Sequence, residues 1–161
     1  MLVIIHSGET GVERGAHHGA RAAGFSVAGY MPADRRDELG KIPEGVHEHL
    51  TLWDERSRRE ALIANIDMAR AVILLVPDAA KAARFPATRW LLTELRSAKR
   101  SFMVVDPSTD LDEVASWVWG FAKPPHQLRL LVTGPRSTRW QQGEALGRRL
   151  IAALAMAEPA A

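Results

Sequence analysis

The first residues place an apolar run, a glycine-bearing loop and the start of a helical pattern in direct succession. The run Leu2–Ile5 is followed by the loop HSGETG at residues 6–11, and small apolar residues then recur at helical spacing over Val12–Ala23. A strand that enters a helix through such a loop directs several backbone N–H groups and the positive end of the helix dipole at one point. This segment therefore predicts a strand–loop–helix unit that binds an anion.

Similar apolar runs recur along the chain and alternate with helical patterns. The strand candidates are residues 2–6, 25–30, 71–76, 102–105 and 128–132. Most are continuously apolar, which is typical of strands covered on both faces in a parallel sheet. The chain therefore predicts a doubly wound α/β fold with a mainly parallel sheet of about five main strands, as one domain over residues 1–157 with a frayed tail at 158–161.

The connection at residues 31–54 is the longest between these strands, and it includes a candidate short edge strand near residues 49–52. We expect it to carry the chain to the other side of the first strand. Ligands of such sheets bind beyond the carboxyl ends of the strands at the point of reversal. The loops after the first and third strands should then face each other.

Several residues predict where helices begin and end. Gly24 should end the first helix, and Asp54 is a candidate N-cap for a helix over residues 54–70. Further helices are expected over residues 88–98 and 110–121 and from residue 138 onward. The spacing of a capping box, Ser/Thr-x-x-Glu/Gln, occurs at Thr10 with Glu13 and at Thr138 with Gln141.

Composition excludes several classes of protein. The 21 basic and 19 acidic residues are interspersed, so the formal charge of +2 does not favour a nucleic-acid binder. The richest basic stretches, residues 56–59 and Arg148-Arg149, lie in helical patterns and predict solvated faces. Cysteine is absent, which excludes disulfides and thiolate chemistry. Without a signal-like or membrane-spanning stretch, we expect a cytoplasmic protein that has no membrane partner.

The histidines and tryptophans predict no metal site and no stacking platform for bases. The six histidines, including His17, His18, His47 and His49, show no zinc-binding spacing, and we expect them at the surface. No nucleophile elbow or Ser-His-Asp arrangement is present. The tryptophans of the helical patterns are typical of core or interface positions.

Four stretches of the chain are similar to motifs of a known family. Residues 7–14, SGETGVER, correspond to its GGQTGVDR, and residues 31–44, MPADRRDELGKIPE, to its PKGRRxEDGxIPE. Residues 134–137, GPRS, match its terminal GPRES, and Asn65-Ile66 stands where the family has Asn-Val. The order and spacing of these pieces span nearly the whole chain. The chain thus resembles the family called putative molybdenum carrier proteins, in the SLOG superfamily that also holds the LOG-type, lysine-decarboxylase-like nucleotide hydrolases.

This resemblance implies a Rossmann-like fold, a homo-oligomer and a pocket for an anionic ligand of molybdopterin or nucleotide type. The chain departs from the family pattern at Ser7, which replaces a glycine, and at Glu9, which replaces a glutamine. A carboxylate within an anion site repels the ligand unless it faces a metal, an arginine or a donor on the ligand.

A second departure concerns catalysis. Where the family has the loop GGTxLT, this chain has RFPATRWLLTE at residues 84–94, without either glycine. In LOG-type hydrolases the corresponding PGGxGTxxE supplies phosphate contacts and the catalytic carboxylate. Pro86 has no N–H to offer, and Glu94 alone does not replace that motif. Hydrolysis is therefore disfavoured, and Trp90, which borders the altered loop, is a candidate for closing the pocket.

The predicted ligand site combines two glycine-bearing strand-to-helix junctions with a polar loop that carries two arginines. Glycine permits close backbone approach to a ligand, and the guanidinium fork suits phosphate. The predicted ligand-binding residues are Ser7, Gly8, Glu9, Thr10, Gly11, Arg14, Arg35, Arg36, Thr88, Gly134, Arg136 and Ser137. For several of them a simpler role stays open, as turn formers, helix caps or solvated side chains.

Three hypotheses of function follow. The first is a binding or carrier protein for a small phosphorylated pterin or nucleotide. The second is a nucleotide N-glycosidic hydrolase, for which Glu94 and Glu9 are the catalytic candidates. The third is a degenerate module that only oligomerises or binds a protein partner, and it predicts an occluded pocket at the strand ends.

Overall fold

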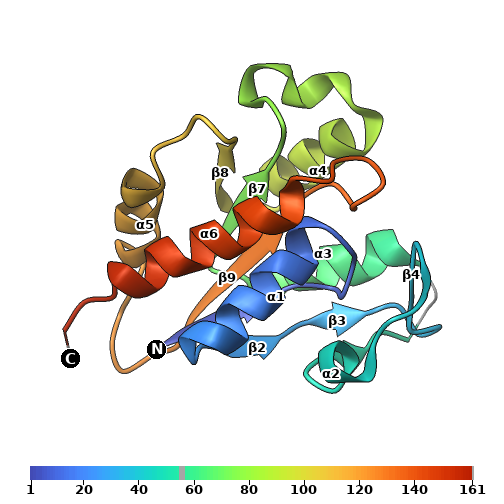
Figure 1. Cartoon of the computed structure of the whole chain (residues 1–161), viewed down its shortest axis with the longest axis horizontal. Coiled ribbons are helices and arrows are strands. Elements are labelled where there is room, and N and C mark those ends of the chain that lie inside the picture. The colour runs from blue at the N-terminus through green and yellow to red at the C-terminus, as the bar shows by residue number, and fades with distance from the viewer. Residues whose placement is uncertain (55–56, 161) are drawn as a thin grey trace.

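The computed structural model describes residues 1–54 and 57–160, and a five-stranded parallel sheet forms its centre (Figure 1). Its strands are, in spatial order, β2 (Ser26–Ala28), β1 (Leu2–Ile5), β9 (Leu128–Thr133), β7 (Ala71–Leu75) and β8 (Ser101–Val105). All five coincide closely with the predicted apolar runs. The α/β prediction is therefore confirmed.

Helices cover both faces of this sheet. One face packs against α1 (Val12–Ala23), α5 (Leu111–Trp119) and α6 (Gly143–Met156). The other packs against α3 (Arg58–Met68), α4 (Pro86–Ser97) and the short 3-10 helix η1 (Ala79–Arg84). The two cores explain why the strands are apolar without alternation, since both faces are buried. No helix of the described residues has both the length and the apolar character needed to cross a membrane.

The strand order reveals where the chain reverses. Numbered from β9 onward, the spatial order becomes 3-2-1-4-5, which is the order of doubly wound dinucleotide-binding sheets. The point of reversal thus lies between β9 and β7. The connection after β2 does cross to the other side of β1, as expected. However, β9, the last strand in the sequence, lies between β1 and β7. The loop after β9 is therefore the one that lies beside the loop after β1.

Most helix boundaries agree with the sequence pattern, and three capping predictions are wrong. Gly24 ends α1 in the left-handed conformation, as expected. The N-cap of α3 is Ser57, whose side chain accepts from the Glu60 backbone N–H, and not Asp54. Neither predicted capping box forms: α1 begins after Gly11 and α6 after Gln142, both without a side-chain cap. The reason is that the side chains of Glu13 and Thr138 bind elsewhere.

The long connection after β2 folds into a small layer at the carboxyl edge of the sheet. It contains β3 (Tyr30–Met31), a hairpin of β4 (Arg36–Asp37) and β5 (Gly40–Lys41), the short α2 (Glu44–His47) and β6 (Thr51–Leu52). The strand expected near 49–52 is β6, but it pairs with β3 and not with the main sheet. A core of its own, made by Met31, Ile42 and Val46, supports this layer.

Candidate functional site

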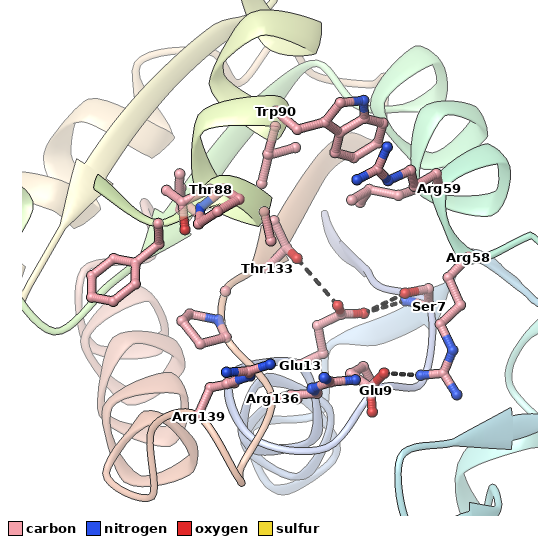
Figure 2. A pocket seen from close by; sticks show the side chains of 18 of the residues that line it. Ser7, Glu9, Glu13, Arg58, Arg59, Thr88, Trp90, Thr133, Arg136 and Arg139 are labelled. Atoms are coloured by element: carbon pink, nitrogen blue, oxygen red, sulfur yellow. Dashed lines mark hydrogen bonds and ion pairs between the residues drawn. The ribbon is translucent and has the colours of Figure 1, made fainter. Parts of the chain in front are cut away.

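A cavity of about 940 Å³ lies beyond the carboxyl ends of β1, β9 and β7, next to the point of reversal (Figure 2). Three groups of side chains line it. Hydroxyls and carboxylates from the loops after β1 and β9 form one part, and apolar residues of α3 and α4 form a wall. The third group consists of five arginines: Arg36, Arg58, Arg59, Arg136 and Arg139.

Glu13 lies at the floor of this cavity, at the start of α1 (Figure 2). One carboxylate oxygen accepts from the Ser7 backbone N–H at 2.6 Å and from the Ser7 hydroxyl at 2.7 Å, and the other accepts from the Thr133 hydroxyl at 3.1 Å. Burial raises the pKa of Glu13 above its usual value, although the hydrogen bonds from Ser7 act in the opposite direction. Glu13 thus joins the loops after β1 and β9, which explains why it caps no helix.

Glu9 forms an ion pair with Arg58 of α3. Arg58 also donates to the Arg36 backbone carbonyl at 3.0 Å. The Glu9 carboxylate therefore faces an arginine, which offsets the repulsion that it would exert on an anion. Arg58 and Arg59 are exposed, as predicted for a solvated face, and they also line the cavity, while Arg56 lies outside the described residues.

The apolar wall presents Trp90 and Phe85 to the cavity. The guanidinium carbon of Arg59 lies 4.8 Å from the centre of the Trp90 ring, a cation–π contact. Phe85 is 55% exposed, so its ring is accessible from the cavity. Thr88 contributes from the first turn of α4. This wall suits the face of a planar ring.

Six of the predicted ligand-binding residues line the cavity: Ser7, Glu9, Arg36, Thr88, Gly134 and Arg136. The other six do not: Gly8, Thr10, Gly11, Arg14, Arg35 and Ser137. Gly11 is needed for packing, because a Cβ there would lie 2.6 Å from the Pro135 carbonyl oxygen, and its φ is +79°. Of the catalytic candidates, Glu9 lines the cavity, and Glu94 on α4 does not.

Arg14 holds the loop after β1 against the β4–β5 hairpin. Its guanidinium donates to the Gly8 carbonyl at 2.9 Å and pairs with Asp37 at 2.7 Å. The Asp37 side chain is 3% exposed and that of Arg14 is 13% exposed. This pairing, and not a ligand, explains a cation in the first turn of a helix, where the dipole is unfavourable to it.

Replacing Arg14 by Gln should therefore cost about 2 kcal/mol of unfolding free energy, because it leaves a buried carboxylate without its counter-charge. The matched control is Arg148→Gln, which removes an exposed pair with Glu144 on α6 and should cost at most about 1 kcal/mol. Urea unfolding at pH 7 compares the two variants. Equal losses of unfolding free energy in the two variants would show that the buried Arg14–Asp37 pair stabilises the fold no more than an exposed pair does.

Glu38, at the tip of the β4–β5 hairpin, reaches the two glycine-bearing loops. It accepts from the hydroxyls of Thr10 and Thr138, from the Ser137 hydroxyl at 2.9 Å and from the Thr138 backbone N–H at 3.1 Å. The Nε of Arg136 lies 3.3 Å from the Glu38 carboxylate. Glu38 was not among the residues predicted to form the site. The only signal for it in the sequence is its position within residues 31–44, one of the stretches that resemble a family motif.

The histidine prediction is wrong for His6 and His17, which are buried. The His6 Nδ1 accepts from the Gly8 backbone N–H at 2.9 Å, so its Nε2 carries the proton and donates to the His17 Nδ1 at 3.0 Å. Burial, with a smaller contribution from neighbouring positive groups, lowers the pKa of His6 and brings that of His17 to about 4. His6 thus holds the loop after β1 through Gly8, and His17 in turn hydrogen-bonds His6.

The donor chemistry of the cavity favours an organic anion over a bare metal ion. Among its described lining residues there is no histidine, cysteine or methionine, and arginines outnumber carboxylates. Within the described part of the chain, no group of three His, Cys, Asp or Glu side chains is placed to hold a metal ion.

Comparisons with known proteins agree with this architecture. No curated protein matches the chain. A crystal structure of the "putative molybdenum carrier protein" from Syntrophus aciditrophicus SB is similar in fold, with a TM-score of 0.79 at 16% identity, over 95% of this chain and 93% of that one. The sequence profile of the circularly permutated YpsA SLOG family matches residues 4–155. A strand order that becomes 3-2-1-4-5 when counted from β9 is what a circular permutation produces. The chain therefore belongs to the circularly permutated YpsA SLOG family.

Proposed function

We propose that the protein binds a small phosphorylated ligand with a planar ring, of nucleotide or pterin type, as a binding or carrier protein. The observation that carries this proposal is a cavity that combines large apolar side chains with five arginines. The ring packs against Trp90 and Phe85, and the phosphate faces Arg136 and Arg139. The neighbour from Syntrophus aciditrophicus is called a putative molybdenum carrier protein, and this name agrees with a carrier role.

Arg139 is the sharpest test of this proposal. It lines the cavity and forms no ion pair with any other described residue. Its charge is therefore available to a phosphate. In calorimetry with adenosine and guanosine monophosphates and a pterin monophosphate, Arg139→Ala should weaken binding at least about tenfold, the worth of one charge-assisted hydrogen bond.

Arg35→Ala serves as the matched control, because Arg35 is an exposed arginine, like Arg139, but lies outside the cavity lining. It should leave the affinity unchanged. Trp90→Leu should weaken binding of the monophosphates and leave that of inorganic phosphate unaltered. Absence of saturable binding to all the probes, or equal effects of Arg35→Ala and Arg139→Ala, would refute the proposal.

A second candidate function, N-glycosidic hydrolysis of a nucleotide, is favoured by the position of Glu13. A buried carboxylate with a raised pKa at the floor of a cavity is typical of an acid–base residue. In this reaction water adds to the anomeric carbon, and the base leaves with a proton. Release of free base by the wild type and its loss in Glu13→Gln would establish this function, with Glu13 in place of Glu9, which is paired with Arg58.

The third hypothesis, a module without a ligand, predicts an occluded cavity, and the open cavity argues against it. Assembly into a homo-oligomer stays a prediction of the family resemblance.

A further inference from the structure

The carboxylate of Glu38 stands within a ring of hydrogen-bond donors. Three hydroxyls, one backbone N–H and one guanidinium surround it, from Thr10, Arg136, Ser137 and Thr138. The side chain is 6% exposed. Although burial raises its pKa, the hydrogen bonds from Thr10, Thr138 and Ser137 outweigh that effect and hold it at about 2. The carboxylate therefore stays charged at any physiological pH.

The donors belong to the two loops for which the sequence predicted anion binding. Thr10 comes from the loop after β1, and the other three residues come from the loop after β9. Donors in such numbers around one anion are the arrangement that proteins use for phosphate. A carboxylate has the charge and the planar pair of oxygens to satisfy part of such a site. The two Glu38 oxygens therefore occupy donors that would suit two oxygens of a phosphate.

This donor ring adjoins the cavity, since Arg136 and Thr138 contribute to both. A ligand whose ring packs against Trp90 would need only to extend past these two residues to reach the donors. While Glu38 occupies them, the side chain of Arg136 is shared with an internal anion. Ligand phosphate and Glu38 therefore require the same donors.

The element that carries Glu38 is small. Strands β4 and β5 contain two residues each, and Leu39 at the turn is 74% exposed. Gly40 has a φ of +128°, and a Cβ at this position would meet no atom within 4 Å, so nothing packs against the turn there. Besides the Glu38 side chain, three contacts attach the hairpin: the Arg14–Asp37 pair, the hydrogen bond from Arg58 to the Arg36 carbonyl, and the one from the Glu38 backbone N–H to Glu9. Displacement of the tip would have to break the contacts of Glu38 and leave Asp37 in place as the hinge side of the hairpin.

We propose that Glu38 is a competing internal occupant of the phosphate site, and that a phosphorylated ligand displaces it together with the tip of the β4–β5 hairpin. This inference rests on the proposed function and adds its regulation. It means that the affinity of the wild type is reduced by the work of removing Glu38 from its donors.

The test measures the affinity for inorganic pyrophosphate and for adenosine monophosphate, by calorimetry, in the wild type and in Glu38→Gln. The amide keeps the size of the side chain and removes its charge, so both probes should bind at least about tenfold more tightly. Glu44→Gln is the matched control, because Glu44 is an exposed carboxylate of the same layer, and its affinities should equal those of the wild type.

A second measurement uses the wild type alone and does not depend on how the variant folds. Trypsin can cleave after Arg36 and Lys41, exposed residues of the hairpin, and after Arg35, which directly precedes it. Saturating pyrophosphate should accelerate cleavage there several-fold if the tip is displaced. Slower cleavage would show that the ligand binds with the hairpin in place.

The outcomes separate the two proposals. Tighter binding by Glu38→Gln with faster cleavage of the liganded wild type supports displacement. Binding that is equal or weaker in Glu38→Gln, while Arg139→Ala still weakens it, overturns the role of Glu38 and leaves the proposed function intact. If neither the wild type nor Glu38→Gln binds pyrophosphate or any of the monophosphates named above, both proposals fall.

Discussion

Replacing Gly15 by alanine should lower the free energy of unfolding by about 4 kcal/mol, although alanine is the better helix former. Gly15 lies in α1 where that helix crosses α6, and a Cβ there would stand 2.1 Å from the Glu144 carbonyl oxygen. The facing Gly147 is equally restricted, since its Cβ would lie 2.7 Å from the Val12 carbonyl oxygen. Backbone contacts of this kind cannot yield without moving one helix away from the other.

Gly45→Ala is the matched control, because Gly45 is also helical and a Cβ there would have no atom within 4 Å. It should be neutral or slightly stabilising. Thermal unfolding should place Gly15→Ala roughly 8–16 °C below the wild type. A loss of unfolding free energy below about 1 kcal/mol would mean that α1 and α6 can move apart at little cost. That result would contradict the importance of their close backbone packing for stability.

Acidification should destabilise the protein through His17 before most carboxylates titrate. Because the folded pKa of His17 is about 4 and an unfolded histidine has a pKa of about 6.5, the unfolded chain binds the proton first. Stability due to this group is complete above pH 6.5 and declines as the pH falls toward 4. The expected loss at pH 5 is about 2 kcal/mol. His6 acts in the same direction.

The measurement compares unfolding free energies at pH 7 and pH 5 in the wild type and in His17→Gln. The comparison is needed because the raised pKa of Glu13 acts in the opposite sense, stabilising the folded state as it takes up a proton. The pH dependence should shrink by about 2 kcal/mol in the variant. His126→Gln, which removes an exposed imidazole, should keep the wild-type dependence. An unchanged dependence in His17→Gln would contradict the assignment.

Local sequence patterns predicted the elements of the fold and only part of the site. The apolar runs, the stripe of small residues on α1 and the stop at Gly24 all depend on neighbours within a few residues, so they were recognisable. The buried stripe was predicted to extend to Ala23, and this part of the prediction is wrong, because Ala23 is exposed. The capping boxes failed because Glu13 and Thr138 satisfy partners far away in the chain.

The sequence predicted where the candidate site lies in the fold, but it did not predict which charged side chains pair with one another there. The glycine loops and Arg136 indicated an anion site at the strand ends. The partners that set its charge are distant in sequence: Glu9 meets Arg58, Arg14 meets Asp37, and Glu38 meets Thr10 and Thr138. Spacing within one element carries no information on such contacts, and Arg139 and Glu13 were missed for the same reason.

The five strands of the main sheet and the five longer helices follow from the order of the amino acids alone, because hydrophobic periodicity and turn residues act over a few positions. The place of β9 between β1 and β7, and the hairpin that brings Glu38 onto the two loops, depend on the folded chain. Strand order and charge pairing arise from packing between segments distant in the chain. The contacts that stabilise them form only when those segments meet in the folded chain.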